Sequence, residues 1–469
     1  MDFGEALEKI ITLVVVLNVL RGLVGRLTGH KAGEAQSPEP LARPPAMDGP
    51  EAHAGWADQA RLRFADALRQ AEGLAARLDD LHRSLAADDP RTADLRDIIR
   101  HPTQSTLDEA LIRLQRGVAL AASAEPGDLE VLVSETPLYA EAFEALGATQ
   151  TRAAVIEGLV RARRAEVGFL GDADAVARAL LAPLTAFAQA EGVPLPAQRP
   201  ICVPADQDAE MVILGLFPDH PVIFVPRDFG DEVPRWPAVA HEVGHVFWRA
   251  VPGFADEAAF FAPGAGPAWL PRQEGRKLLF DLGAALGAWQ MELVCDAFAV
   301  LLTGPAGLRG LVHAFEDAGD PQAVARAHVG FGGRTLDEHP PAELRVRVAA
   351  RVLDRMGFDR EAKALLGQWV QLHGEQPHLV IPTLFGSALG WPIEAVEDAA
   401  WKMIRQMLDH RFASLGGRGL ESVPGLAVGP GLWGRALARV PHLLEGVAFN
   451  DDARVVLMAA VEAAAEHPN

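Results

Sequence analysis

The segment Ala-Val-Ala-His-Glu-Val-Gly-His-Val-Phe at residues 238–247 constrains the chain most, because it contains the pattern H-E-x-x-H. On an α-helix, His241 and His245 lie one turn apart on one face, so both imidazoles can reach one metal ion. Glu242 is rotated about 100° from His241 and lies beside that ion, where it can act on a metal-bound water. Zn²⁺ suits this arrangement, because it accepts imidazole nitrogen and lowers the pKa of bound water to about 7.

The residues around this motif favour a buried helix over a chance match. The flanking positions are apolar, as expected of a helix inside a protein. Gly244 costs a helix ~1 kcal/mol against alanine, which indicates that another segment packs or approaches closely at this point.

A catalytic zinc site needs a third protein ligand and leaves one position open for water. Glu292 is the best candidate, because it shares one helical face with Asp296 in a largely apolar segment at residues 279–302. Two carboxylates on a buried helix are costly unless they are paired or bind a metal. We therefore interpret Glu292 as the ligand and Asp296 as the acceptor that orients a ligand histidine. The alternative is an amphipathic helix with an ordinary solvated Glu/Asp pair.

Three motifs follow one another in the chain: H-E-x-x-H, then Glu-Leu-Val-Cys-Asp-Ala-Phe-Ala from residue 292, then His-Pro-Pro-Ala-Glu-Leu-Arg from residue 339. In this order they resemble the motifs of the HtpX-like and CAAX-prenyl-protease-type zinc metallopeptidases, which are gluzincins. The resemblance covers about residues 200–350 and nothing outside them. It implies zinc ligation by His241, His245 and Glu292, general-base catalysis by Glu242, an orienting role for Asp296, and a place on the substrate side for His339 and Arg345.

The chain departs from these enzymes in three respects. Its catalytic segment lacks the several membrane spans of the integral-membrane members. Cys295 stands where alanine is usual, and Glu338 precedes His339 in place of a small hydroxyl residue. The first difference bears on the membrane-protein substrates of the family and not on the chemistry.

His339 and Arg345 also have an interpretation from chemistry alone. Peptide hydrolysis develops an oxyanion, which a positioned cationic or N–H donor stabilises. Tyrosine often has this role, but the only tyrosine is Tyr139, far upstream. His339 is then the best donor, with Arg345 beside it. The alternative is that His-Pro-Pro is a turn before a helix and that Arg345 lies on a solvated helix face.

Composition limits the classes of function. The chain carries 63 acidic and 43 basic residues, for a net charge of −20, and this argues against a nucleic-acid binder. The two cysteines, Cys202 and Cys295, do not suggest a disulfide framework. A cysteine within the proposed metal helix favours a reducing compartment.

Residues 10–27 are apolar enough to be considered as a membrane anchor. If they span a membrane, the basic residues that follow predict a cytoplasmic body tethered to the inner face of the cytoplasmic membrane. An interfacial or self-associating helix, or a soluble helix docked on the body, also fits the pattern.

The predicted fold class is α+β, mainly α, with a zincin-like domain and a small mixed sheet flanked by helical domains. Residues 222–225 read as a strand bounded by prolines, which favours an edge strand that pairs with the substrate backbone. Its residues are Val222, Ile223, Phe224 and Val225. The predicted layout is an apolar helix at 1–29, a Pro/Ala/Gly-rich linker at 30–55, a helical domain at 56–195, the metallopeptidase domain at 196–352 and a C-terminal helical domain at 353–469.

These observations predict a zinc-dependent endopeptidase that acts on protein or peptide substrates. The alternative is a metal-stabilised helical binding or regulatory protein with a degenerate or partner-gated protease site. Its helical domains would then bind a regulatory protein. A structural zinc site closes its fourth position with cysteine or histidine, so a Cys295 sulfur within bonding distance of the metal would favour this alternative.

Overall fold

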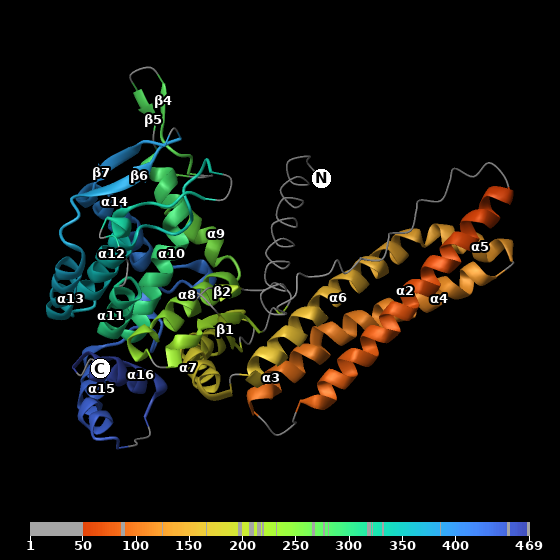
Figure 1. Cartoon of the computed structure of the whole chain (residues 1–469), viewed down its shortest axis with the longest axis horizontal. Helices are drawn as coiled ribbons and strands as arrows, with labels where there is room; N and C mark the ends of the chain where they lie inside the picture. The colour runs from red at the N-terminus through yellow and green to blue at the C-terminus, as the bar shows by residue number, and fades with distance from the viewer. Residues whose placement is uncertain are drawn as a thin grey trace. The chain divides into compact units, whose positions relative to one another are not determined.

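The computed structural model describes residues 50–466, with gaps at 86–89, 124, 166, 196–198, 206–210, 213–216, 218–219, 231, 265–267, 275–276, 280, 317–319, 321, 331–332, 385 and 448–450. The chain divides into two compact units, Met1–Val167 and Gly168–Asn469 (Figure 1). The described residues are mainly helical with small β-sheets, which confirms the mainly α character of the predicted α+β class.

The first unit is helical throughout its described part. Its long helices α2, α4 and α6 pack along one another (Figure 1). Phe64 of α2 meets Tyr139 of α6 edge to face, with ring centroids 4.9 Å apart. A Cβ on Gly117 of α4 would fall 2.7 Å from the Phe64 ring, so glycine allows α2 and α4 to approach closely. The elements are α2 (Pro50–Ser84), α3 (Pro90–Ile98), the π-helical η1 (Ile99–Gln104), α4 (Ser105–Ala122), α5 (Pro126–Ser134) and α6 (Thr136–Ala165).

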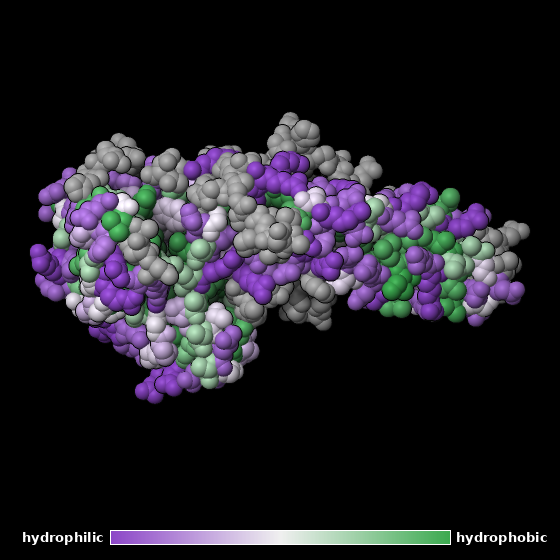
Figure 2. All heavy atoms as spheres, turned by 90° about the horizontal axis from the view of Figure 1, so that it is seen from below, coloured by the Kyte–Doolittle hydropathy of each residue, from purple (hydrophilic) through white to green (hydrophobic). Residues whose placement is uncertain are grey.

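Apolar side chains gather on part of the first unit, as the face seen in Figure 2 shows. Large apolar residues that are exposed in this unit include Leu62, Ile112 and Leu138. Exposed apolar surface of this kind is typical of protein interaction sites. The partner expected for the helical domains stays a prediction.

The second unit combines helices with short strands. Its first half holds α7 (Val167–Glu191), β1 (Ile201–Ala205), β2 (Met211–Val212), β3 (Val222–Pro226), η2 (Arg227–Gly230), η3 (Val233–Arg235), α8 (Ala238–Ala250), α9 (Phe254–Ala259), β4 (Arg272–Glu274), β5 (Lys277–Leu279) and α10 (Leu282–Thr303). Its second half holds α11 (Pro305–Ala314), η4 (Ala323–Ala325), α12 (Ala342–Arg355), α13 (Asp359–His373), β6 (His378–Pro382), β7 (Ala388–Pro392), α14 (Ile393–Asp409), η5 (Ala413–Leu415), η6 (Leu420–Ser422), α15 (Pro430–Leu444) and α16 (Ala453–Glu466).

The predicted strand at residues 222–225 exists as β3, but its predicted place at a sheet edge is wrong. The sheet has the order β1-β3-β2, with β1 parallel and β2 antiparallel to the central β3. The flanking prolines suggested an edge, yet Pro226 pairs at the very end of the strand, opposite Ala205, where it interrupts nothing. Every residue of β3 is buried. Val222, Ile223, Phe224 and Val225 are therefore core residues and not an exposed rail for a substrate.

The compact units follow the chain differently from the predicted domains. The side chains of α7 share a core with β1 and β3, so the division falls near residue 167 and not near residue 195. That same core continues through α12 to α16, across the boundary predicted at residues 352–353. Helix α2 begins at Pro50, inside the stretch predicted as a linker.

The predicted membrane anchor at residues 10–27 lies outside the described residues. Among the described residues, α10 alone is long and apolar enough to cross a membrane. However, 83% of its most apolar stretch is buried inside the protein, which is typical of a core helix. Its apolar character therefore has an explanation within the fold.

Candidate metal centre

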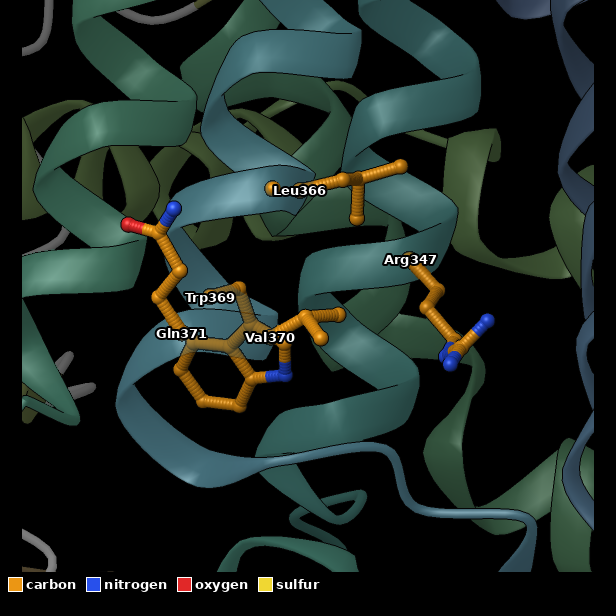
Figure 3. Close-up of a pocket in the computed structure, with 6 residues that line it drawn as sticks. Arg347, Leu366, Trp369, Val370 and Gln371 are labelled. Atoms are coloured by element: carbon orange, nitrogen blue, oxygen red, sulfur yellow. The ribbon is translucent and has the colours of Figure 1, made fainter.

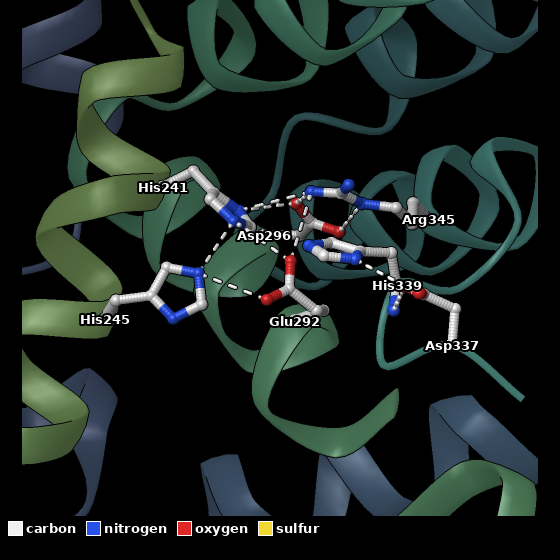
Figure 4. Close-up of polar contacts among 7 residues, drawn as sticks. All are labelled: His241, His245, Glu292, Asp296, Asp337, His339 and Arg345. Atoms are coloured by element: carbon white, nitrogen blue, oxygen red, sulfur yellow. Dashed lines mark hydrogen bonds and ion pairs between the residues drawn. The ribbon is translucent and has the colours of Figure 1, made fainter. Parts of the chain in front are cut away.

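Helices α8 and α10 carry the predicted ligands and pack directly against each other. A Cβ on Gly244 of α8 would lie 2.9 Å from the Cα of Cys295 on α10. A side chain at residue 244 would therefore push the helices apart, which is the close approach that the glycine indicates in the sequence. This contact brings Glu292, one turn before Cys295, level with the histidines of α8 (Figure 4).

Three ligand atoms converge between these helices (Figure 4). The Nε2 atoms of His241 and His245 are 3.2 Å apart. The Glu292 carboxylate places Oε2 3.3 Å from the first of these nitrogens and Oε1 3.2 Å from the second. Around a tetrahedral zinc ion with bonds of about 2.0–2.1 Å, neighbouring ligand atoms lie roughly 3.3 Å apart. The donor set and its spacing thus fit an ion of this size, and the cluster could hold a metal ion as predicted.

A line of hydrogen bonds runs behind the cluster and sets the direction of one ligand. His241 donates from Nδ1 to Oδ1 of Asp296 at 2.8 Å, which leaves Nε2 to face the other ligands. Arg345 of α12 donates from Nε and Nη2 to the two oxygens of Asp296, each at 2.8 Å. This is the geometry expected of a carboxylate that fixes the tautomer of a metal-binding histidine.

Opposite charges are paired within the cluster and behind it. Burial alone would raise the pKa of Glu292, but hydrogen bonds from both histidines hold it well below its usual range. Burial would likewise raise the pKa of Asp296, and the Arg345 charge lowers it instead. Burial opposes the charge on His241, yet its hydrogen bonds with the two carboxylates raise its pKa to about 10. For His245 burial dominates and lowers the pKa. A cation must therefore compete with a proton for Nε2 of His241.

Glu242 is buried on α8 next to these groups. Its charge acts on the pKa of both Cys295 and Arg345, so it lies close to the line of hydrogen bonds. Burial, helped by the neighbouring carboxylates, raises the pKa of the Cys295 thiol well above its usual value. Among the described residues, the cluster that could hold a metal ion consists of His241, His245 and Glu292 and does not include Cys295. A structural zinc site closed by Cys295 is therefore not supported.

The position of Arg345 differs from both sequence-based interpretations, which place it on the substrate side or on a solvated helix face. Its side chain is only 11% exposed and binds Asp296, so it lies on neither a substrate face nor a solvated helix face. The ring of Phe315 lies under the guanidinium, 5.5 Å from it. Arg345 therefore holds Asp296, which in turn orients His241.

His339 precedes α12 and is half exposed, with 54% of its side chain accessible. Its backbone N–H and its ring Nδ1 both bind Oδ1 of Asp337, at 3.0 and 2.6 Å. Asp337 in turn accepts a hydrogen bond at its backbone oxygen from Nε1 of Trp289 on α10, at 3.0 Å. The sequence patterns single out neither Asp337 nor Trp289. The spacing Asp-x-His, typical of a local side-chain-to-backbone turn, is a signal that could have identified Asp337.

A surface hollow of about 530 Å³ lies over α12 and α13, apart from the cluster (Figure 3). Arg347 of α12 contributes to it, and two residues along a helix correspond to a rotation of about 200° from Arg345. The hollow therefore opens on the opposite side of α12 from the metal ligands. Its lining residues are Arg347, Leu366, Gly367, Trp369, Val370 and Gln371.

Comparison with known proteins gives no relative. No protein-family model, curated protein or solved structure matches the chain.

Proposed function

We propose that the chain is a zinc-dependent endopeptidase of gluzincin type, similar to the HtpX-like and CAAX-prenyl-protease-type metallopeptidases. The observation that carries the proposal is the cluster of ligand atoms on His241, His245 and Glu292. The two Nε2 atoms are 3.2 Å apart, and each lies 3.2–3.3 Å from one oxygen of the Glu292 carboxylate. A carboxylate that is not a ligand, Glu242, lies buried beside it. Two histidines, one acidic ligand and one adjacent acidic base are the components that zinc peptidases use.

Each residue then has a definite task in peptide hydrolysis. A zinc ion at this site would polarise the scissile carbonyl and make a water more acidic. Glu242 accepts a proton from the attacking water and delivers it to the leaving amine. His339 offers a ring nitrogen to the charge that develops on the substrate. Asp296 and Arg345 touch no substrate and hold His241 in the orientation that ligation needs.

The substrate class that we propose is protein or peptide, because the chemistry of the site is amide hydrolysis. Nucleic acid does not fit a chain with a net charge of −20. We further propose a cytoplasmic location, with residues 10–27 as the element that associates with the membrane.

The decisive experiment compares the wild-type chain with Glu242→Gln. Glutamine keeps the size of the side chain but cannot accept the proton, so cleavage of a quenched peptide library should fall by ~10²–10⁴-fold. Zinc content and thermal stability should barely change, because Glu242 is not one of the clustered ligands. Glu338→Gln, an exposed glutamate beside His339, is the matched control and should retain activity.

Two outcomes would contradict the proposal. Cleavage that survives Glu242→Gln would exclude this residue as the base. A wild-type chain that holds zinc but cleaves nothing, while ligand variants lose a cellular effect that Glu242→Gln retains, would favour the metal-stabilised binding protein.

A further inference from the structure

Two hydrogen bonds hold the backbone of Asp337, one at its N–H and one at its carbonyl oxygen. Its N–H donates to the backbone oxygen of His328 at 3.0 Å. Its own backbone oxygen accepts the Nε1–H of Trp289 at 3.0 Å. Trp289 is fully buried and precedes Glu292 by three residues on α10, so the two share one side of that helix. Asp337 is thereby fixed relative to a metal ligand.

The side chain of Asp337 binds His339 and so restrains its position. One carboxylate oxygen, Oδ1, accepts from the backbone N–H of His339 and from its ring Nδ1. The first bond fixes the turn that enters α12, and the second fixes the rotation of the ring (Figure 4). Because Nδ1 is used, Nε2 is the nitrogen that remains for a substrate.

We propose that Asp337 is a positioning residue that fixes the orientation of the His339 ring, so that Nε2 is the nitrogen presented to the substrate. This proposal rests on the proposed endopeptidase function, in which His339 stabilises the negative charge that develops on the substrate. Asp337 acts only through His339, and Trp289 acts only through Asp337.

An ordinary surface Asp–His pair would not have this construction. Exposed ion pairs are held by their side chains alone and contribute little. Here the backbone that carries the Asp337 carboxylate makes two hydrogen bonds, and one of them is to the fully buried indole of Trp289. Such support is what keeps a reacting group within the narrow range of useful geometries.

Kinetics of four chains test the coupling: wild type, Asp337→Ala, His339→Ala and the double variant. Misplacement of a reacting group costs on the order of 10²-fold, so Asp337→Ala should lower kcat roughly 10–100-fold and leave zinc content unchanged. In the His339→Ala background the same substitution should change kcat within roughly twofold, because nothing is left to position. Independent, multiplicative losses would overturn the proposal, and Glu338→Ala is the matched control.

A spectroscopic measurement decides the same point without any activity. In zinc-loaded protein with ¹⁵N-labelled histidine, the Nδ1–H of His339 should show the downfield proton shift and slow exchange of a hydrogen bond to a carboxylate, and Asp337→Ala should remove both. Asp337→Asn keeps an acceptor oxygen and should retain more of this shift than alanine does. An unchanged Nδ1–H shift in Asp337→Ala excludes a positioning role. If the wild-type chain cleaves no peptide, the proposed function fails, and these shifts still decide the role of Asp337.

Discussion

Arg345 binds both oxygens of the Asp296 carboxylate, and Asp296 in turn binds Nδ1 of His241. The fork of a guanidinium matches a carboxylate in this two-bond geometry, which an ammonium group cannot reproduce. One line of hydrogen bonds therefore crosses from α12 through α10 to α8. It sets the direction of a candidate metal ligand from a residue far along the chain.

Substitution of Arg345 should weaken zinc binding although Arg345 is not a ligand. Groups that orient a ligand typically contribute 10–100-fold to metal affinity, so Arg345→Lys should raise the zinc Kd by about that factor. Arg345→Met should also lower the free energy of unfolding by ~3–5 kcal/mol, because it leaves Asp296 buried without its partner. Zinc competition with a chelator and urea unfolding measure these effects.

The control for this experiment lies two residues away on the same helix. Arg347 binds Glu343 and Glu397 on the other side of α12. Arg347→Lys should leave the zinc Kd unchanged. Equal zinc affinities in the Arg345 variants and the wild type would show that Asp296 needs no such support.

Removal of the metal should destabilise the folded chain. Binding to the native state alone adds ~2.7 kcal/mol at a free zinc concentration of 100 times Kd, so a chelator should lower Tm and added zinc should restore it. His245→Ala should lose both the zinc, about one ion per chain, and this response. His378→Ala, a histidine on the exposed end of β6, should keep both. Zinc retained in His245→Ala would disprove the ligand assignment.

The sequence predicts the ligand cluster well because its spacing is local. His241 and His245 share a face through helix periodicity, and the same rule pairs Glu292 with Asp296. Gly244, too, is interpretable, because a glycine within an apolar helix indicates close packing. All of these residues meet in the structure, where α8 and α10 touch at Gly244.

Partners that lie far apart in sequence could not be predicted in this way. Periodicity does not tell which buried carboxylate Arg345 meets, and the motif alone suggested the substrate side. The central place of β3 depends on pairing with β1 and β2, which no pattern within the strand reveals. Trp289 and Asp337 meet across 48 positions, so only the folded chain shows their contact.

Glu257 should make the stability of the second unit depend on pH. Burial alone would raise its pKa, but hydrogen bonds from Ser414 and the backbone N–H of Ala413 lower it below the ordinary 4.5. A lowered pKa contributes stability above about pH 4.5 that disappears as pH falls through the folded-state value. His410 also faces this carboxylate, with Nε2 at 3.8 Å.

Glu257→Gln should therefore lower the free energy of unfolding by ~1.5–3 kcal/mol at pH 7, and by less below pH 4.5. Urea unfolding at several pH values measures the difference, and the same series in a His410→Gln background separates the contribution of the imidazole. Glu375→Gln, on an exposed loop, is the control and should show no such difference. A deficit that is the same at every pH would contradict the mechanism.

Gly244→Ala should disturb the metal centre without touching a ligand. The added Cβ would lie 2.9 Å from the Cα of Cys295 and 3.2 Å from the Cβ of Phe298, so α8 and α10 must separate. Overpacking of this kind costs about 1–3 kcal/mol, and it outweighs the ~1 kcal/mol that alanine gains over glycine in a helix. Because His241 and Glu292 lie on the two separated helices, the zinc Kd should rise together with the loss of stability.

Gly367→Ala is the matched control for this prediction. Gly367 lies within α13, and a Cβ there would meet nothing within 4 Å. The same substitution should therefore raise the free energy of unfolding by up to ~1 kcal/mol and leave the zinc Kd unchanged. Calorimetric Tm and zinc titration of the two variants measure both quantities. If Gly244→Ala were as stable as Gly367→Ala and bound zinc equally well, the helix contact would not be what holds the ligands together.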